Sequence, residues 1–151
     1  LAALDAGFFG QAHTTWAAAS DRLRVDGWIP GEDADRLAVL WWFGVLIGNT
    51  DMHYGNVSLF LSPHRPLALA PAYDMLPMLY LPDPEGGLPE RAFSPAPPPP
   101  EALGHWLRAS AMAGVFWERA AACELISAGF RETARRNAET VQLHRHEFGG
   151  R

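Results

Sequence analysis

Three oxygen-bearing side chains, Asp51, Asn56 and Asp74, have the types and the spacing that a phosphoryl-transfer site requires. Such a site needs one carboxylate to accept the proton of the substrate hydroxyl, and polar oxygens to hold the metal ions that neutralise the triphosphate. Asp51 precedes Asn56 by five residues, the interval between the base and the metal-binding Asn in protein-kinase catalytic loops. Because hard oxygen ligands suit Mg²⁺, the three residues predict a magnesium-dependent phosphotransfer site.

A buried helix is expected directly before these residues. Asp33 is suitably placed to cap it, and residues 37–47 are apolar on nearly every face, which predicts a central position in the core. Gly48 follows and is typical of the left-handed residue that ends a helix. Asp51 is therefore expected on a loop that leaves a rigid element.

A β-hairpin is expected between Asn56 and Asp74. Residues 57–61 and 66–70 are mostly apolar, and the Ser-Pro-His-Arg segment between them is typical of a turn. In an antiparallel pair, the residue before the first strand and those after the second lie at the same open end. The hairpin therefore predicts that Asn56 and Asp74 are neighbours.

Two segments carry a resemblance to a known family: residues 48–56, Gly-Asn-Thr-Asp-Met-His-Tyr-Gly-Asn, and residues 70–75, Ala-Pro-Ala-Tyr-Asp-Met. They resemble the HipA-like serine/threonine kinases, whose catalytic loop reads Asn-Thr-Asp-x-His-x-x-Asn and whose metal-binding Asp follows a Pro-x-Tyr. Within that family, the chain looks most like the YjjJ-like subgroup, which is fused to its own DNA-binding segment.

The resemblance implies a role for each residue of the motif. Asp51 would be the catalytic base, Asn56 and Asp74 would bind ATP through Mg²⁺, and His53 would support the catalytic loop by hydrogen bonding. The implied fold for residues 1–151 is the C-terminal lobe of a protein kinase, mainly α with a small antiparallel β-hairpin. The implied partners are a protein substrate phosphorylated on Ser or Thr and, as for bacterial toxins of this family, a DNA-binding antitoxin protein or domain.

Two parts of a kinase are not visible in the sequence. All twelve Lys and Arg residues are Arg, so the Lys that orients the phosphates is missing, and residues 7–10 are too short and too apolar for the glycine-rich loop. The chain also begins with Leu1 and not Met, which suggests trimming from something longer. We therefore expect an N-terminal ATP-binding lobe in the parent protein, and no activity from this chain alone.

The rest of the chain divides into a loop and helices. Residues 82–100 are rich in Pro, Gly and Ser and predict a mobile loop in the place where kinases keep their activation and substrate segments. Residues 101–112, 115–127 and 131–146 have helical periodicity, with Gly129 as a stop between the last two. Residues 14–25 predict a further short amphipathic helix.

Composition narrows the classes of function. A net charge of -5 gives nucleic acid or an anionic membrane no reason to bind this surface as a whole, and no apolar run is long enough to span a bilayer. The single cysteine, Cys123, cannot form an internal disulfide. A cytoplasmic protein is the expectation.

Two alternatives stay open from the sequence. Small-molecule and lipid kinases also use an Asp, an Asn and a second Asp on a similar lobe. A noncatalytic, pseudokinase-type module would retain the fold and bind a partner through the Pro-rich loop or the C-terminal helix.

Overall fold

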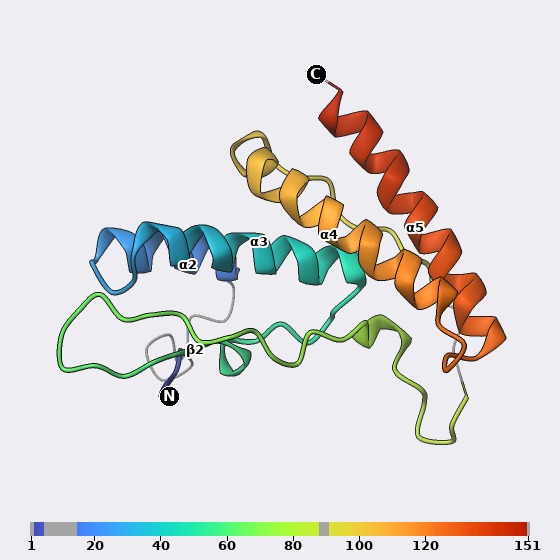
Figure 1. Ribbon diagram of the computed structural model, residues 1–151, viewed down its shortest axis with the longest axis horizontal. Helices are drawn as coiled ribbons and strands as arrows, with labels where there is room; N and C mark the ends of the chain where they lie inside the picture. Colours follow the sequence, from blue (N-terminus) through green and yellow to red (C-terminus); the bar gives the residue numbers. More distant parts are fainter. Residues whose placement is uncertain (1, 5–14, 88–90, 151) are drawn as a thin grey trace. The chain divides into compact units, whose positions relative to one another are not determined.

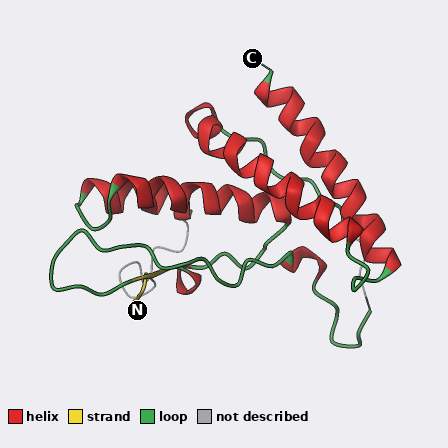
Figure 2. Cartoon of the chain, viewed as in Figure 1, coloured by secondary structure: helices red, strands yellow, loops and turns green. Residues whose placement is uncertain are grey.

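The computed structural model describes residues 2–4, 15–87 and 91–150. They form two compact units: unit 1 comprises Leu1–Trp41 and Asp51–Met75, and unit 2 comprises Trp42–Thr50 and Leu76–Arg151. Helices dominate the described residues, as predicted, whereas the segment from residue 49 to residue 77 is mainly loop (Figures 1 and 2). Residues 7–10, which are too short and too apolar for a glycine-rich phosphate loop, lie outside the described part.

Two helices run through the first part of the chain (Figure 1). Helix α2, Trp16–Val25, is capped by Thr15, whose hydroxyl accepts a hydrogen bond from Ala18 N at 3.1 Å. Helix α3, Gly31–Ile47, ends as predicted at Gly48, which has a φ of 71°. A Cβ at position 48 would lie 3.2 Å from the Cβ of Leu79, so the glycine serves both the left-handed turn and a close approach.

Asp33 is not the cap of α3, which corrects the prediction. The helix begins two residues earlier, so Asp33 lies in its first turn and is 3% exposed. Its carboxylate accepts a hydrogen bond from Leu69 N at 2.8 Å and pairs with Arg36 at 2.8 Å. The side chain thus ties the start of α3 to the segment that follows the predicted hairpin turn.

The predicted hairpin is present in a reduced form. Its two halves share two backbone hydrogen bonds, from Phe60 N to Ala68 O and from Ala70 N to Ser58 O, both at 2.9 Å, and one isolated bridge. Regular strand is confined to β2, Ser58–Leu59, which pairs antiparallel with β1, Ala2–Ala3. The second half also bonds on its outer side, where Leu67 N donates to Trp28 O at 2.7 Å.

The core of unit 1 collects apolar side chains from both helices and from the hairpin. Met52 and Tyr54, from the segment that carries Asp51 and Asn56, pack against this cluster. The buried members are Leu4, Trp16, Leu23, Ile29, Ala34, Leu37, Val57, Leu59 and Leu67.

Unit 2 is built on two long helices, α4, Leu103–Ala122, and α5, Ala128–Gly149, which pack side by side (Figure 1). The break predicted between residues 112 and 115 is wrong, because α4 runs through Gly114 with a continuous buried face. That face comprises Trp106, Ala109, Ser110, Ala113 and Trp117.

The predicted stop at Gly129 is also wrong. Ser127 caps α5, its hydroxyl accepting from Phe130 N at 3.3 Å, so Gly129 lies inside the first turn. An N-cap hydroxyl satisfies an amide that the helix leaves unpaired, and this signal outweighed the glycine.

The remaining elements are single turns of 3₁₀ helix: η1, Tyr54–Asn56, η2, Met78–Tyr80, and η3, Pro100–Ala102. In the Pro-rich segment, residues 82–87 and 91–99 contain neither helix nor strand, as the sequence predicts. No helix in the described ranges is both long enough and apolar enough to cross a membrane.

Candidate active site

All four residues predicted for the site belong to unit 1. Asp51 and His53 lie on the loop after α3, Asn56 ends the turn η1, and Asp74 follows the hairpin. The side chains of Asp51 and His53 are 51% and 59% exposed. The Asp51 carboxylate is therefore accessible to a substrate without any movement of the residues around it.

Asn56 closes the loop that Asp51 opens. Its amide nitrogen Nδ2 donates a hydrogen bond to the backbone carbonyl of Asp51 at 3.0 Å, and its backbone N donates to His53 O at 3.1 Å. This bond fixes the orientation of the amide, and the side-chain oxygen Oδ1 is the acceptor atom that can bind a cation. The five-residue interval seen in the sequence thus corresponds to one closed turn.

His53 lies within this turn. Its Nε2 is 3.8 Å from Oδ1 of Asp51. A Cβ on Gly55 would meet the His53 ring at 2.8 Å, closer than real Cβ contacts allow, so the ring lies directly on the bare backbone of Gly55. The absence of a side chain at position 55 is what lets the imidazole reach toward Asp51.

Asp74 is held to the same turn by its neighbour Tyr73. The Tyr73 hydroxyl donates to Gly55 O at 2.7 Å and lies 2.9 Å from the hydroxyl of Ser58. The segments that carry Asn56 and Asp74 therefore lie side by side, as the predicted hairpin required. Asp74 has a φ of 57°, in the left-handed region that Asp tolerates better than most residues.

Comparison with known proteins places these residues in a family. A model of the HipA-like C-terminal domain matches residues 13–143. The chain belongs to the HipA-like C-terminal domain family. A similar relative is Toxin YjjJ of Escherichia coli strain K12, which is 37% identical over 128 residues, corresponding to 85% of this chain and 29% of the relative.

This HipA-like chain therefore spans less than a third of the length of the relative that it matches. The family and the YjjJ-like subgroup predicted from residues 48–56 and 70–75 are confirmed. No solved structure matches the chain.

The donor atoms of this HipA-like site are oxygens. In the described part of the chain, no group of three His, Cys, Asp or Glu side chains could hold a metal ion. The set offered by Asn56 and Asp74 is of another kind, one amide oxygen and one carboxylate. Mg²⁺ accepts such a sparse set because it usually keeps several waters and takes further ligands from phosphates. The residues therefore fit Mg²⁺ better than Zn²⁺, whose sites use His and Cys.

Two residues position the site. Tyr73 was predicted to be a core or loop anchor and not a nucleotide contact, and its hydrogen bonds to Gly55 and Ser58 agree with an anchor. Asp33 was predicted to be a helix cap, and its bond to Leu69 was not predicted. The Pro-x-Tyr-Asp pattern points to Tyr73, since the tyrosine immediately precedes a candidate ligand. No local pattern points to Asp33, because its partner Leu69 is 36 residues away.

Proposed function

We propose that this chain is the C-terminal catalytic lobe of a HipA-like protein serine/threonine kinase. The observation that carries the proposal is the closed turn between Asp51 and Asn56, to which Tyr73 fastens Asp74, in a chain of this family. Kinase catalysis consists mainly of positioning and charge stabilisation. A turn that fixes one base beside two oxygen ligands meets that need.

Asp51 is proposed as the base. Its exposed carboxylate accepts the proton of a Ser or Thr hydroxyl, whose oxygen then forms a bond to the γ-phosphorus of ATP while the bond to the ADP oxygen breaks. His53, at 3.8 Å from Asp51, orients this carboxylate and does not contact the substrate.

Asn56 and Asp74 are proposed to hold Mg²⁺ with the phosphates of ATP. The ion supplies positive charge against the charge that develops on the transferred phosphoryl group. The chain's contribution is to point Oδ1 of Asn56 away from Asp51, by engaging Nδ2, and to present the Asp74 carboxylate from a left-handed residue.

The groups that grip the nucleotide are proposed to come from another part of the parent protein. This chain has no Lys, and Arg is a poor substitute for a compact ammonium beside a metal-bound triphosphate. We therefore expect the 151 residues alone to be inactive, and the parent, with its additional lobe, to be the enzyme.

A toxin role is proposed from the relative, whose name is Toxin YjjJ. Phosphorylation of an essential protein on Ser or Thr would arrest growth. A DNA-binding antitoxin, as a separate protein or as a segment of the parent, would restrain it.

The decisive test compares the parent protein with its Asp51→Asn variant. We expect phosphorylation of Ser or Thr in cell extract, measured by radiolabel transfer from ATP and by phosphoproteomics, to fall about 100- to 10,000-fold, the usual contribution of a general base. Growth arrest on expression should disappear with it. Asp21→Asn is the matched control, because Asp21 is an exposed carboxylate that pairs with Arg24 at 3.5 Å, outside the candidate site. Equal labelling by the parent and by Asp51→Asn would refute the assignment of the base.

A further inference from the structure

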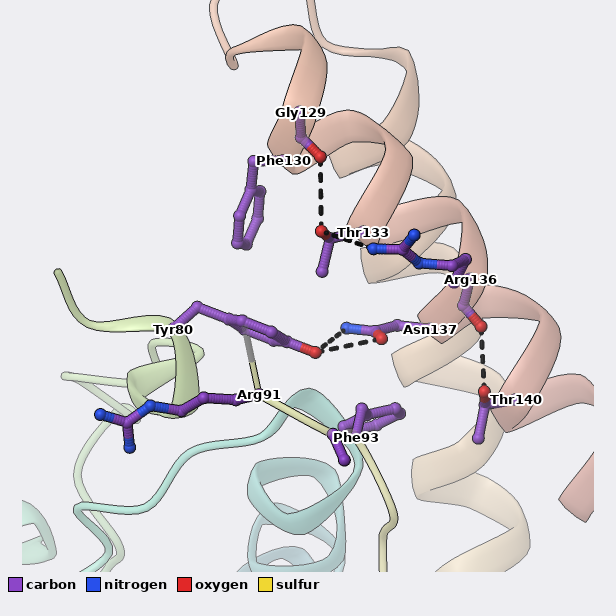
Figure 3. A pocket seen from close by; sticks show the side chains of 10 residues that line it. Tyr80, Arg91, Phe93, Gly129, Phe130, Thr133, Arg136, Asn137 and Thr140 are labelled. Carbon is purple, nitrogen blue, oxygen red and sulfur yellow. Dashed lines mark hydrogen bonds between the residues drawn. The ribbon is translucent and has the colours of Figure 1, made fainter. Parts of the chain in front are cut away.

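A cavity separate from the candidate active site lies entirely within unit 2. None of the candidate active-site residues lines it. Its volume is about 710 Å³, within the range of small-molecule and cofactor sites. Figure 3 shows that it lies between α5 and the segment that carries Tyr80 and Arg91. The lining residues are Tyr80, Arg91, Ala92, Phe93, Gly129, Phe130, Thr133, Arg136, Asn137 and Thr140.

The polar centre of the cavity is the pair Tyr80 and Asn137. The Tyr80 hydroxyl donates to Oδ1 of Asn137 at 3.1 Å, while Nδ2 of Asn137 donates to the same hydroxyl at 2.7 Å (Figure 3). An amide nitrogen carries two hydrogens, so Nδ2 retains one further donor. Because Asn137 is 4% exposed, this donor is buried and held in a fixed orientation.

The charge of the described lining residues is positive. Arg91 and Arg136 contribute two guanidinium groups, and none of the described residues that line the cavity is an Asp or a Glu. Arg136 contacts Oγ1 of Thr133 at 3.4 Å. Its neighbour Arg135, by contrast, forms an ion pair with Glu132. In a chain with a net charge of -5, a concave surface whose described lining carries two cations and no acid favours an anionic ligand.

Burial keeps the Tyr80 hydroxyl neutral in the cavity. It raises the pKa of Tyr80 above its ordinary value of 10.0, although the hydrogen bond from Asn137 and the nearby charge of Arg136 act in the opposite direction. Tyr80 therefore stays protonated at neutral pH and keeps its role as a donor to Asn137.

The walls of the cavity are aromatic. Tyr80 and Phe130 meet edge to face with ring centroids 5.4 Å apart, and Phe93 completes the set. Behind them lies Trp117, fully buried, at 6.1 Å from Tyr80 and 5.8 Å from Phe93. A wall of rings fixed by a buried indole offers both faces and edges to a further flat ring.

We propose that this cavity is a binding site for a small aromatic anion of the size of a nucleoside monophosphate. The ring of the ligand lies against Tyr80, Phe93 and Phe130. Its anionic group lies at Arg136, and the buried amide of Asn137 donates to a polar atom between the ring and that group. The site is separate in its residues from the proposed kinase site, so it would serve recognition or regulation and not phosphoryl transfer.

Nuclear magnetic resonance of the 151-residue chain tests the proposal, with adenosine 5′-monophosphate as the probe. We expect saturable shifts of the Asn137 side-chain amide at probe concentrations up to about 5 mM, in the weak range for a single charged site. Inorganic phosphate alone and adenosine alone should each bind at least about tenfold more weakly, because each lacks one half of the recognised chemistry.

Two arginine variants decide where the probe binds. Arg136→Gln should weaken binding at least about tenfold, since a hydrogen-bonded charge pair contributes well over 1 kcal/mol. Arg135→Gln, one residue away and paired with Glu132, should leave binding unchanged. Both positions are exposed on α5, and circular dichroism confirms that each variant folds. Asp74→Asn separates this cavity from the proposed kinase site and should also leave binding unchanged.

Three results would overturn the proposal. The first is the absence of any shift at Asn137 up to about 5 mM probe, a concentration that reveals even millimolar affinity. The second is equal binding by Arg136→Gln and the unmodified chain. The third is binding of phosphate alone, or of adenosine alone, that is as tight as binding of adenosine 5′-monophosphate. Such a result would mean that the cavity recognises only an anion or only a ring, and not a molecule that combines them.

Discussion

In unit 2 the buried centre is aromatic, whereas in unit 1 the segments of the candidate site are tied by polar side chains. Trp106 and Trp117 are fully buried on α4, and Trp117 meets the rings of Tyr80, Phe93 and Phe116 at 5.0–6.1 Å. In unit 1, the Asp33 carboxylate and the Tyr73 hydroxyl hold the loops through hydrogen bonds of 2.7–2.9 Å.

The difference follows from what each unit has to position. A helix pair buries a continuous apolar stripe, so its stability comes from packing. A catalytic loop has to expose its carboxylates, so few of its own atoms can be buried in a core. Hydrogen bonds from side chains to the backbone hold it in place instead of packing. Removing one side chain from the core of unit 2 should therefore mainly lower the free energy of unfolding. Removing one from the ties of unit 1 should mainly displace the candidate site residues.

Trp117→Ala should give the largest loss of stability. It opens a cavity among the surrounding aromatic rings and leaves the Leu46 carbonyl without the indole N–H that donates to it at 3.0 Å. The free energy of unfolding should fall by about 3–5 kcal/mol, the range for Trp to Ala in a core. Urea denaturation followed by circular dichroism measures the change. Leu125→Ala is the control, because Leu125 is 97% exposed. A loss below about 1 kcal/mol would mean that the aromatic cluster is not the main support of unit 2.

Asp33→Ala should give the second largest loss. Leu69 N loses its acceptor and Arg36 loses its closest partner, so we expect the free energy of unfolding to fall by about 2–3 kcal/mol, as for hydrogen bonds to a charged group. Chemical denaturation of the same chain measures it.

The adjacent acid provides a matched control for Asp33. Glu32 is in the same first turn and also pairs with Arg36, at 3.6 Å, but its side chain is 72% exposed. Glu32→Ala should cost at most about 1 kcal/mol, as for a surface ion pair. Equal losses for the two variants would show that the helix dipole, and not the bond to Leu69, accounts for the effect of Asp33.

Much of the site in unit 1 could be predicted from the sequence, because its signals are local. Gly48 marked the end of α3, and the interval from Asp51 to Asn56 corresponds to a single turn. The hairpin that brings Asp74 to this turn was predicted from two apolar runs, but its strands proved shorter. The second half also bonds to a residue far away in sequence, since Leu67 N donates to Trp28 O, and no local pattern encodes such a partner.

Unit 2 was harder to predict, for a physical reason. Gly114 and Gly129 are typical helix breakers, yet both lie inside helices because a buried stripe and a serine cap outweigh a glycine penalty of about 1 kcal/mol. The cavity could not be predicted at all. Its lining spans residues 80–140, and nothing in the spacing of Tyr80, Arg136 and Asn137 indicates that they meet.

Tyr73→Phe should have a smaller effect on stability than Trp117→Ala or Asp33→Ala, and a distinct effect on function. The hydroxyl is on a side chain that is 41% exposed, so its loss should lower the free energy of unfolding by only about 0.5–1.5 kcal/mol. Because it is the tie between Asp74 and Gly55, the proposed phosphorylation rate of the parent should fall about tenfold or more, since small misplacements of reacting groups are costly. Ser58→Ala removes one partner but keeps the Gly55 bond, so it should slow the reaction less. A Tyr73→Phe parent with an unchanged rate would show that Asp74 is held in place by other contacts.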